Sequence, residues 1–140
     1  TAGGGVFLGY DEIDPATSGQ RQFRCQALEL QYSGNQMALA RSVLIFSPQS
    51  HLKERHSLVG VEVMLPRREE MKLNVEVSGG RLHAVRVGGR ECPELTNQEV
   101  EQDPILQEVD GRGKLGVLAE NCTMVFRHAT WNSNLEKEQR

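Results

Sequence analysis

The chain has 140 residues, a formal net charge of -3 and an isoelectric point near 5.8. A chain of this length can bury enough apolar surface to fold without a metal or a disulfide. We therefore expect one β-rich domain over residues 1–140, with flexible ends at 1–5 and 132–140. Because the net charge is negative, the sequence excludes a general attraction to nucleic acid or to anionic membranes.

The three cysteines, Cys25, Cys92 and Cys122, lie far apart and show no CxxC spacing. This argues against a zinc site and a thioredoxin-type redox motif, so we expect no metal and no cofactor. The odd, sparse count fits the cytoplasm or another reducing compartment, and one disulfide with a free thiol is the alternative. No apolar run approaches the roughly 20 residues that a membrane-spanning helix needs, and no charged-then-apolar segment opens the chain, so we expect neither a membrane span nor a signal peptide in these residues.

The first third of the chain reads as strands. Residues 6–10 form a short apolar run, and residues 11–20 have the composition of a loop. Over residues 22–32 the apolar positions change phase partway along, which predicts a bulge or a strand that leaves one sheet face for another. A compact turn then leads into residues 36–46, where the hairpin-like turn favours a strand and the segment MALAR makes a helix the alternative.

The clearest pattern is a predicted three-stranded meander. Apolar and polar residues alternate over residues 58–65 and again over 71–77, which is strand periodicity. Gly79 and Gly80 follow, and glycine takes the positive φ of a tight hairpin turn at no steric cost. A third apolar run over residues 82–87 completes the meander, around which we expect the other strands to be arranged.

Charged residues flank this predicted meander. The polar and basic residues 49–57 are expected to form an exposed excursion before it. Glu62 and Glu76 lie opposite the apolar phases of their strands and should face solvent. With Arg67 and Arg68 in the link between the strands, they are the candidate partner-facing residues. The two arginines would contribute to a basic patch that also contains Arg41, Lys53 and Arg55.

An acidic segment follows the meander. Residues 89–110 contain seven acidic residues against Arg90 alone. Thr96 and Glu99 have the spacing of a capping box, which predicts a short helix from about residue 97. Pro104 is expected to break this helix or to begin a second turn, because proline is tolerated only in the first turn.

Two further strands are predicted over residues 115–119 and 122–128. The whole pattern gives an all-β, mainly antiparallel fold: a roughly eight-stranded barrel or sandwich with one short helical insertion near residues 97–109.

The sequence contains no catalytic motif. There is no GxSxG, and Cys25 is expected to be an inert thiol in the core. Cys92 lies among carboxylates, which disfavour its thiolate. His51 and His56 are five residues apart, which does not place two metal ligands on one helical face, and His83 fits a structural position in a strand. We therefore assign no catalytic or metal-binding residue.

The candidate ligand-binding residues are Phe126, His128 and Trp131. Phe126 and His128 share one face of a predicted strand, and the single tryptophan follows three residues later. In a barrel these side chains would line a pocket at the mouth. The alternative is that Trp131 only fills the end of the barrel.

Two segments resemble known families. VEVMLP, EEMKLNVEV and GGRLHAV, within residues 61–85, resemble the strand–turn–strand core of small heat-shock and CS-type chaperone domains. QYSGNQMALAR, residues 31–41, resembles the CGNG-type segment of diaminopimelate-epimerase-like isomerases. Ser33 stands where that pattern has its catalytic cysteine, which argues against proton abstraction by such a cysteine here.

These observations predict a non-catalytic binding domain that recognises a protein partner or an apolar small ligand. The alternatives are an enzyme, isomerase-like, whose polar residues meet only in space, and a chaperone-like β-sandwich oligomer that pairs through edge strands. A homo-oligomer is compatible with each.

Overall fold

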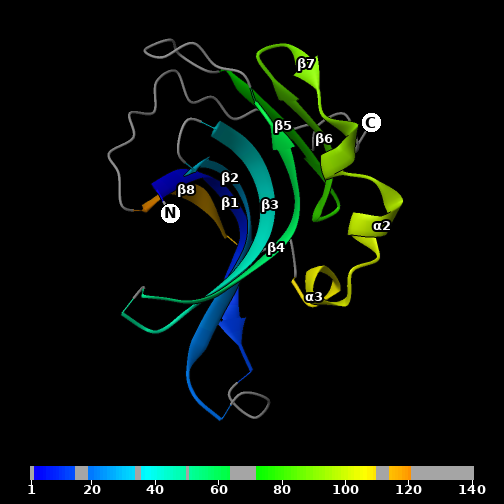
Figure 1. Cartoon of the computed structure of the whole chain (residues 1–140). Helices are drawn as coiled ribbons and strands as arrows, with labels where there is room; N and C mark the ends of the chain where they lie inside the picture. Colours follow the sequence, from blue (N-terminus) through cyan, green and yellow to red (C-terminus); the bar gives the residue numbers. More distant parts are fainter. Residues whose placement is uncertain are drawn as a thin grey trace.

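The computed structural model describes residues 2–14, 19–33, 36–49, 51–63, 72–109 and 114–120. They form an all-β, mainly antiparallel fold with short helical segments between two of the strands, as the sequence predicts (Figure 1). The strands are β1 (Ala2–Ile13), β2 (Gln22–Ser33), β3 (Gln36–Phe46), β4 (Leu52–Glu62), β5 (Leu73–Ser78), β6 (Arg81–Val87), β7 (Arg90–Glu91) and β8 (Lys114–Glu120). The helical segments are η1 (Pro93–Leu95), α2 (Gln98–Glu101) and α3 (Pro104–Gln107).

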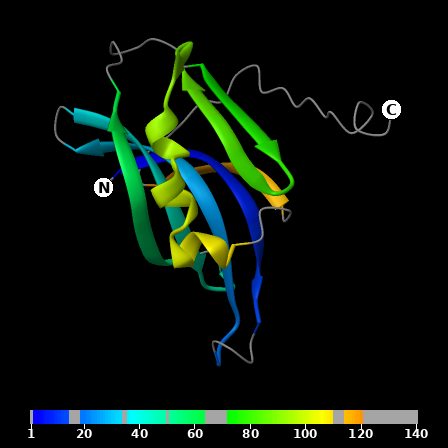
Figure 2. The same cartoon turned by 90° about the vertical axis from the view of Figure 1, so that its right-hand side faces the viewer.

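The strands form two antiparallel sheets. The large sheet has the order β4-β3-β2-β1-β8, and the small sheet has the order β5-β6-β7. The strands of the large sheet bow strongly, and the small sheet and the helices lie on the outside of the bow (Figures 1 and 2). We call this covered side the outer face and the opposite, concave side the inner face. Among the described strands, β4 and β8 are the two edges of the large sheet, which does not close into a barrel.

The central strands β2 and β3 are buried on both faces. On the outer face, Leu28 and Leu30 pack with Leu82 and Val85 of the small sheet, so one apolar cluster joins the two sheets. The side chains between these positions point to the inner face. There Cys25, Ala27 and Leu44 form a second cluster with aromatic neighbours. A strand that is buried on both sides reads as a continuous apolar run, not as an alternation.

The two short helices pack on the outer face beside the β5–β6 hairpin (Figure 2). Val100 of α2 and Leu106 of α3 are buried against Val43 of β3. Each helix begins at a side-chain cap: Asn97 accepts a hydrogen bond from the amide of Val100, and Asp103 accepts one from the amide of Ile105. These caps satisfy amides that have no partner within the helix.

The predicted capping box was wrong by one residue, because Asn97, not Thr96, caps α2. The helical insertion near residues 97–109 is confirmed. Pro104 begins α3, where its missing amide and fixed φ cost nothing.

The predicted meander was also wrong. Residues 58–62 belong to β4 of the large sheet, whereas β5 and β6 pair with each other in the small sheet. The strand β4 begins at Leu52, so residues 52–57 are not an excursion but part of an edge strand that pairs with β3. An edge strand tolerates this charged sequence because it is open to solvent on one side. The β5–β6 turn is confirmed, with φ of 60° at Gly79 and 75° at Gly80.

Residues 22–32 contain neither the bulge nor the change of sheet face that their phase change predicts. The pairing of β2 with β3 is continuous, and both phases are apolar because both faces are buried. The bulge lies in β1, where the pairing with β2 shifts between Leu8 and Asp11 and Gly9 takes a φ of 68°.

The glycine-rich start of the chain, which was expected to fray, lies inside the large sheet. Gly3, Gly4 and Gly5 are buried and pair with β2 on one side and β8 on the other. Segment 36–46 is a strand, as predicted. The predicted strand 122–128 and the tail 132–140 lie outside the described residues. No helix in the described residues is long and apolar enough to cross a membrane.

Candidate functional site

A pocket of about 260 Å³ opens on the inner face of the large sheet. We call it the inner pocket. It extends from the edge strand β4 to the opposite edge strand β8, and most of its side chains are apolar. Its lining consists of Glu29, Leu44, Phe46, His51, Leu52, Arg55, Leu118 and Ala119.

Aromatic side chains extend the apolar wall of the inner pocket along the sheet. Tyr10 stacks on Phe23 with 5.5 Å between ring centroids and 3° between ring planes. Phe7 and Phe46 lie against the same tyrosine in tilted contacts of 5.7 and 6.2 Å. Gly116 of β8 provides the room for Phe7, since a side chain at this position would lie 2.6 Å from the ring. Aromatic contacts of this kind fix ring positions and favour a preformed wall.

One charged pair lies beside this apolar wall. The Glu29 carboxylate on β2 has a side chain that is only 2 % exposed. Arg55 on β4 donates from Nε to Oε2 at 3.2 Å and from Nη2 to Oε1 at 3.1 Å. Gln31 donates a third hydrogen bond at 3.1 Å. A bidentate, charge-assisted pair of this geometry holds both side chains in one orientation.

The Glu29–Arg55 pair crosses β3 diagonally. Glu29 and Arg55 lie on β2 and β4, the two neighbours of β3 in the sheet. Ala40 is the residue of β3 that pairs with Glu29, and Leu44 is the one that pairs with Arg55. Between them on this face of β3 lies the buried Ser42, whose short side chain leaves room for the arginine to reach the carboxylate.

The thiol nearest to this face is not a nucleophile. Burial, and then the charge of Glu29, raises the pKa of Cys25 to about 12. The thiol is therefore protonated at neutral pH, and only the thiolate is reactive. No three His, Cys, Asp or Glu side chains among the described residues lie close enough to hold a metal ion. The chemistry that the inner pocket offers is hydrogen bonding at one end of an apolar surface.

The ligand-binding residues predicted from the sequence, Phe126, His128 and Trp131, lie outside the described residues. So do Arg67 and Arg68 of the predicted partner-facing surface.

The other two predicted partner-facing residues, Glu62 and Glu76, are exposed as expected. They lie on different sheets, because β4 and β5 belong to different sheets. Glu76 is 3.8 Å from Arg86. The predicted basic patch was wrong for two of its members: Arg41 is buried on the outer face, and Arg55 pairs with Glu29.

Glu29, Arg55 and the apolar lining were not predicted from the sequence as parts of one site. The sequence contained one indication of this site. Glu29 is a charged residue in the middle of an apolar run, and a charge in such a place needs a partner. The partner could not be found, because Arg55 was assigned to an exposed loop. Its side chain meets Glu29 only after β4 pairs with β3.

Searches of known protein families, of curated proteins and of solved structures find no match for this chain. We therefore infer its function from the geometry of the inner pocket.

Proposed function

We propose that the protein binds a small, mainly apolar molecule with one polar group in the inner pocket. The observation that carries this proposal is the combination of four leucine and phenylalanine side chains with one fixed ion pair in a single concave lining. Ligand pockets are typically apolar with a few polar groups that orient the ligand. An apolar cavity of about 150 Å³ is large enough for benzene, so a pocket of about 260 Å³ suits a ligand of about two rings.

The pocket favours a small ligand over a protein partner, the other interpretation of the sequence. Its apolar residues lie in a concavity, whereas a stable partner surface extends over about 800 Å² of each protein. It also favours binding over catalysis. Glu29 would be the natural base of an isomerase-like site, but both of its oxygens already accept hydrogen bonds from Arg55. We assign the pair to orienting the polar group of the ligand.

The test uses 1-naphthylamine, which is uncharged at neutral pH, has two fused rings and one amine, and fluoresces according to the polarity around it. We expect saturable binding to the wild-type chain with a blue shift of the emission. Replacing Leu118 with tryptophan fills the pocket and should weaken binding at least about tenfold, which corresponds to 1.4 kcal/mol.

Val117→Trp is the matched control. Val117 is the neighbour of Leu118 on β8, and its side chain is 52 % exposed and absent from the pocket lining. This variant should bind the probe as the wild type does. Equal losses in the two variants, or no saturable binding to the wild type, would overturn the proposal.

A further inference from the structure

A second pocket, of about 320 Å³, lies on the outer face of the large sheet, opposite the inner pocket. We call it the outer pocket. Its floor is the sheet, and its walls come from α2, α3 and the β5–β6 turn. It is lined by Gln26, Arg41, Gly80, Arg81, Glu101, Leu106, Gln107 and Val109.

Arg41 lies at the floor of the outer pocket and is 1 % exposed. Its Nη1 donates to the carbonyl oxygen of Leu95 at 2.9 Å and to Oε1 of Glu101 at 2.6 Å, and its Nη2 donates to Oε1 of Gln26 at 3.0 Å. Nε, in contrast, is buried and has no hydrogen-bond partner among the described residues. A buried donor without an acceptor is costly, so this edge of the guanidinium favours an acceptor from outside.

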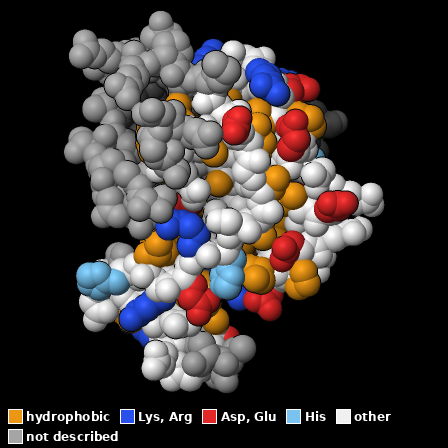
Figure 3. All heavy atoms as spheres, in the orientation of Figure 1, with side chains coloured by type: hydrophobic (Ala, Val, Ile, Leu, Met, Phe, Trp, Pro, Cys, Tyr) orange, Lys and Arg blue, Asp and Glu red, His pale blue; other side chains and the backbone are white. Residues whose placement is uncertain are grey.

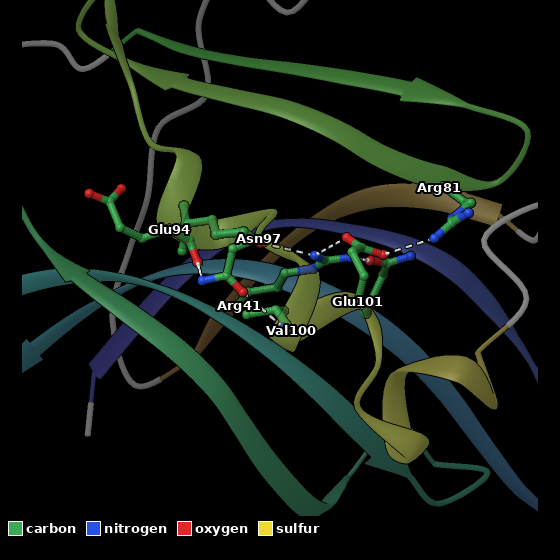
Figure 4. A network of polar contacts seen from close by, with 8 residues as sticks. Arg41, Arg81, Glu94, Asn97, Val100 and Glu101 are labelled. Carbon is green, nitrogen blue, oxygen red and sulfur yellow. Dashed lines mark hydrogen bonds and ion pairs between the residues drawn. The ribbon is translucent and has the colours of Figure 1, made fainter.

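Two arginines share one carboxylate in the outer pocket (Figure 4). Arg81 approaches Glu101 from the β5–β6 hairpin, with 3.9 Å between Nη2 and Oε2, and its own side chain is 69 % exposed. Glu101 therefore neutralises one of the two guanidinium groups, and the lining keeps one net positive charge. Gln26 adds a donor, because its amide oxygen faces Arg41 and leaves the amide nitrogen for another acceptor.

Several acidic side chains lie on the right of Figure 3, the side of the small sheet and the helices in Figure 1. Glu94 and Glu99 are exposed, where salt screens their charge within about 10 Å. Glu108 is 3.4 Å from Arg24, which offsets its charge. The charges that line the outer pocket itself therefore decide which ion it attracts at short range.

We propose that the outer pocket binds a small organic carboxylate through Arg41, Arg81 and Gln26. The planar carboxylate matches the guanidinium edge, and the apolar part of the ligand lies against Leu106 and Val109. Arg41 presents the buried donor, and Arg81 closes over the ligand from the hairpin. This site is independent of the inner pocket, because the large sheet separates the two.

The test is a titration of the full ¹⁵N-labelled chain with butyrate, followed by NMR at the Nε–H signals of the arginines. We expect a saturable shift of the Arg41 signal. Butylammonium, which has the same chain length and the opposite charge, should cause none. Absence of a saturable shift with butyrate, or equal shifts with both compounds, would overturn the proposal. Arg41 would then serve only to hold the helical segments on the sheet.

Two variants should change the affinity in opposite directions. Arg81→Gln should weaken butyrate binding about fivefold, because one of two positive charges is lost. Glu101→Gln should strengthen it about fivefold, because the competing negative charge is removed while an oxygen still faces Arg41. Circular dichroism and thermal unfolding confirm that each variant is folded before the titration.

Arg86→Gln is the control for net charge, since Arg86 lies on the same strand and pairs with Glu91 away from the pocket. It should leave the affinity for butyrate within about twofold of the wild type. Leu118→Trp should also leave it unchanged, which separates this proposal from that for the inner pocket. If Arg81→Gln and Glu101→Gln bind butyrate as tightly as the wild type, the carboxylate binds elsewhere and the proposal fails.

Discussion

Arg41 connects three elements through one guanidinium group. It holds Gln26 of β2, the end of η1 at Leu95 and Glu101 of α2. Replacing it with methionine keeps most of the apolar stem but removes every hydrogen bond and leaves Glu101 without its nearest partner. Because breaking one side of a buried ion pair is strongly destabilising, we expect a loss of about 3–5 kcal/mol in the free energy of unfolding, measured by urea denaturation.

The control for Arg41 is Arg24→Met. Arg24 also joins the large sheet to a helix, at 3.4 Å from Glu108, but that carboxylate is 67 % exposed. An ion pair in solvent contributes little, so this variant should lose no more than about 1 kcal/mol. Similar losses of unfolding free energy in the two variants would contradict the conclusion that the buried contacts of Arg41 hold the helical segments on the sheet.

Because of Cys25, the stability of the fold depends on pH in the alkaline range. Burial raises the pKa of its thiol from 9.0 to about 12, so the folded chain keeps this proton at pH values where the unfolded chain loses it. The contribution of the Cys25 thiol to stability is fully present below about pH 9 and is lost as the pH rises from 9 toward 12. We expect the free energy of unfolding to fall over this range, and to fall less steeply in Cys25→Ala. Identical slopes for the two proteins would show that Cys25 ionises freely in the fold.

At the scale of single elements, the glycines of β1 set how closely this strand approaches β2. A side chain at Gly5 would overlap the backbone carbonyl oxygen of Leu28 on β2. Gly5→Ala therefore has to displace one strand from the other, and overpacking of this kind costs about 1–3 kcal/mol. We expect a decrease of this size in the free energy of unfolding, measured by urea denaturation.

Gly60→Ala is the matched control in the same sheet. Gly60 lies on the edge strand β4, and a side chain there would meet no atom within 4 Å. This variant should be neutral within about 0.5 kcal/mol. If Gly60→Ala destabilises the protein as much as Gly5→Ala does, close strand approach is not the reason for glycine in β1.

The strands could be predicted where one face of the strand is buried and the other is exposed to solvent. Segments 73–78 and 81–87 alternate in burial as they alternate in sequence, and the two glycines of their turn have the expected positive φ. The prediction failed where both faces are buried, as in β2, since the loss of alternation resembles a bulge. It also failed for β4, because an edge strand with the sequence KERH has the composition of a loop.

At the scale of the molecule, the fold class could be predicted but the distribution of strands between two sheets could not. Local periodicity says which segments are strands, whereas the partner of each strand is decided by long-range packing. The same limit applies to both pockets. Glu29 and Arg55 are 26 residues apart, and Arg41 and Glu101 are 60 apart, so neither pair appears as a motif.

The large sheet separates two faces of different character. Each face holds one buried charge on a central strand, Glu29 on the inner side and Arg41 on the outer side, and each charge has its partner on another element. The inner side adds aromatic and leucine side chains, and the outer side adds a second arginine. This division is the reason for assigning a mainly apolar ligand to the inner pocket and a carboxylate to the outer one.

The most direct test of the inner pocket is methyl NMR of the leucine-labelled chain during titration with 1-naphthylamine. The signals of Leu44, Leu52 and Leu118 should shift in a saturable manner, because these residues line the inner pocket. The signals of Leu82 and Leu95, which lie in the core between the two sheets, should stay in place. Shifts confined to Leu82 and Leu95, or no shift at all, would contradict ligand binding on the inner face.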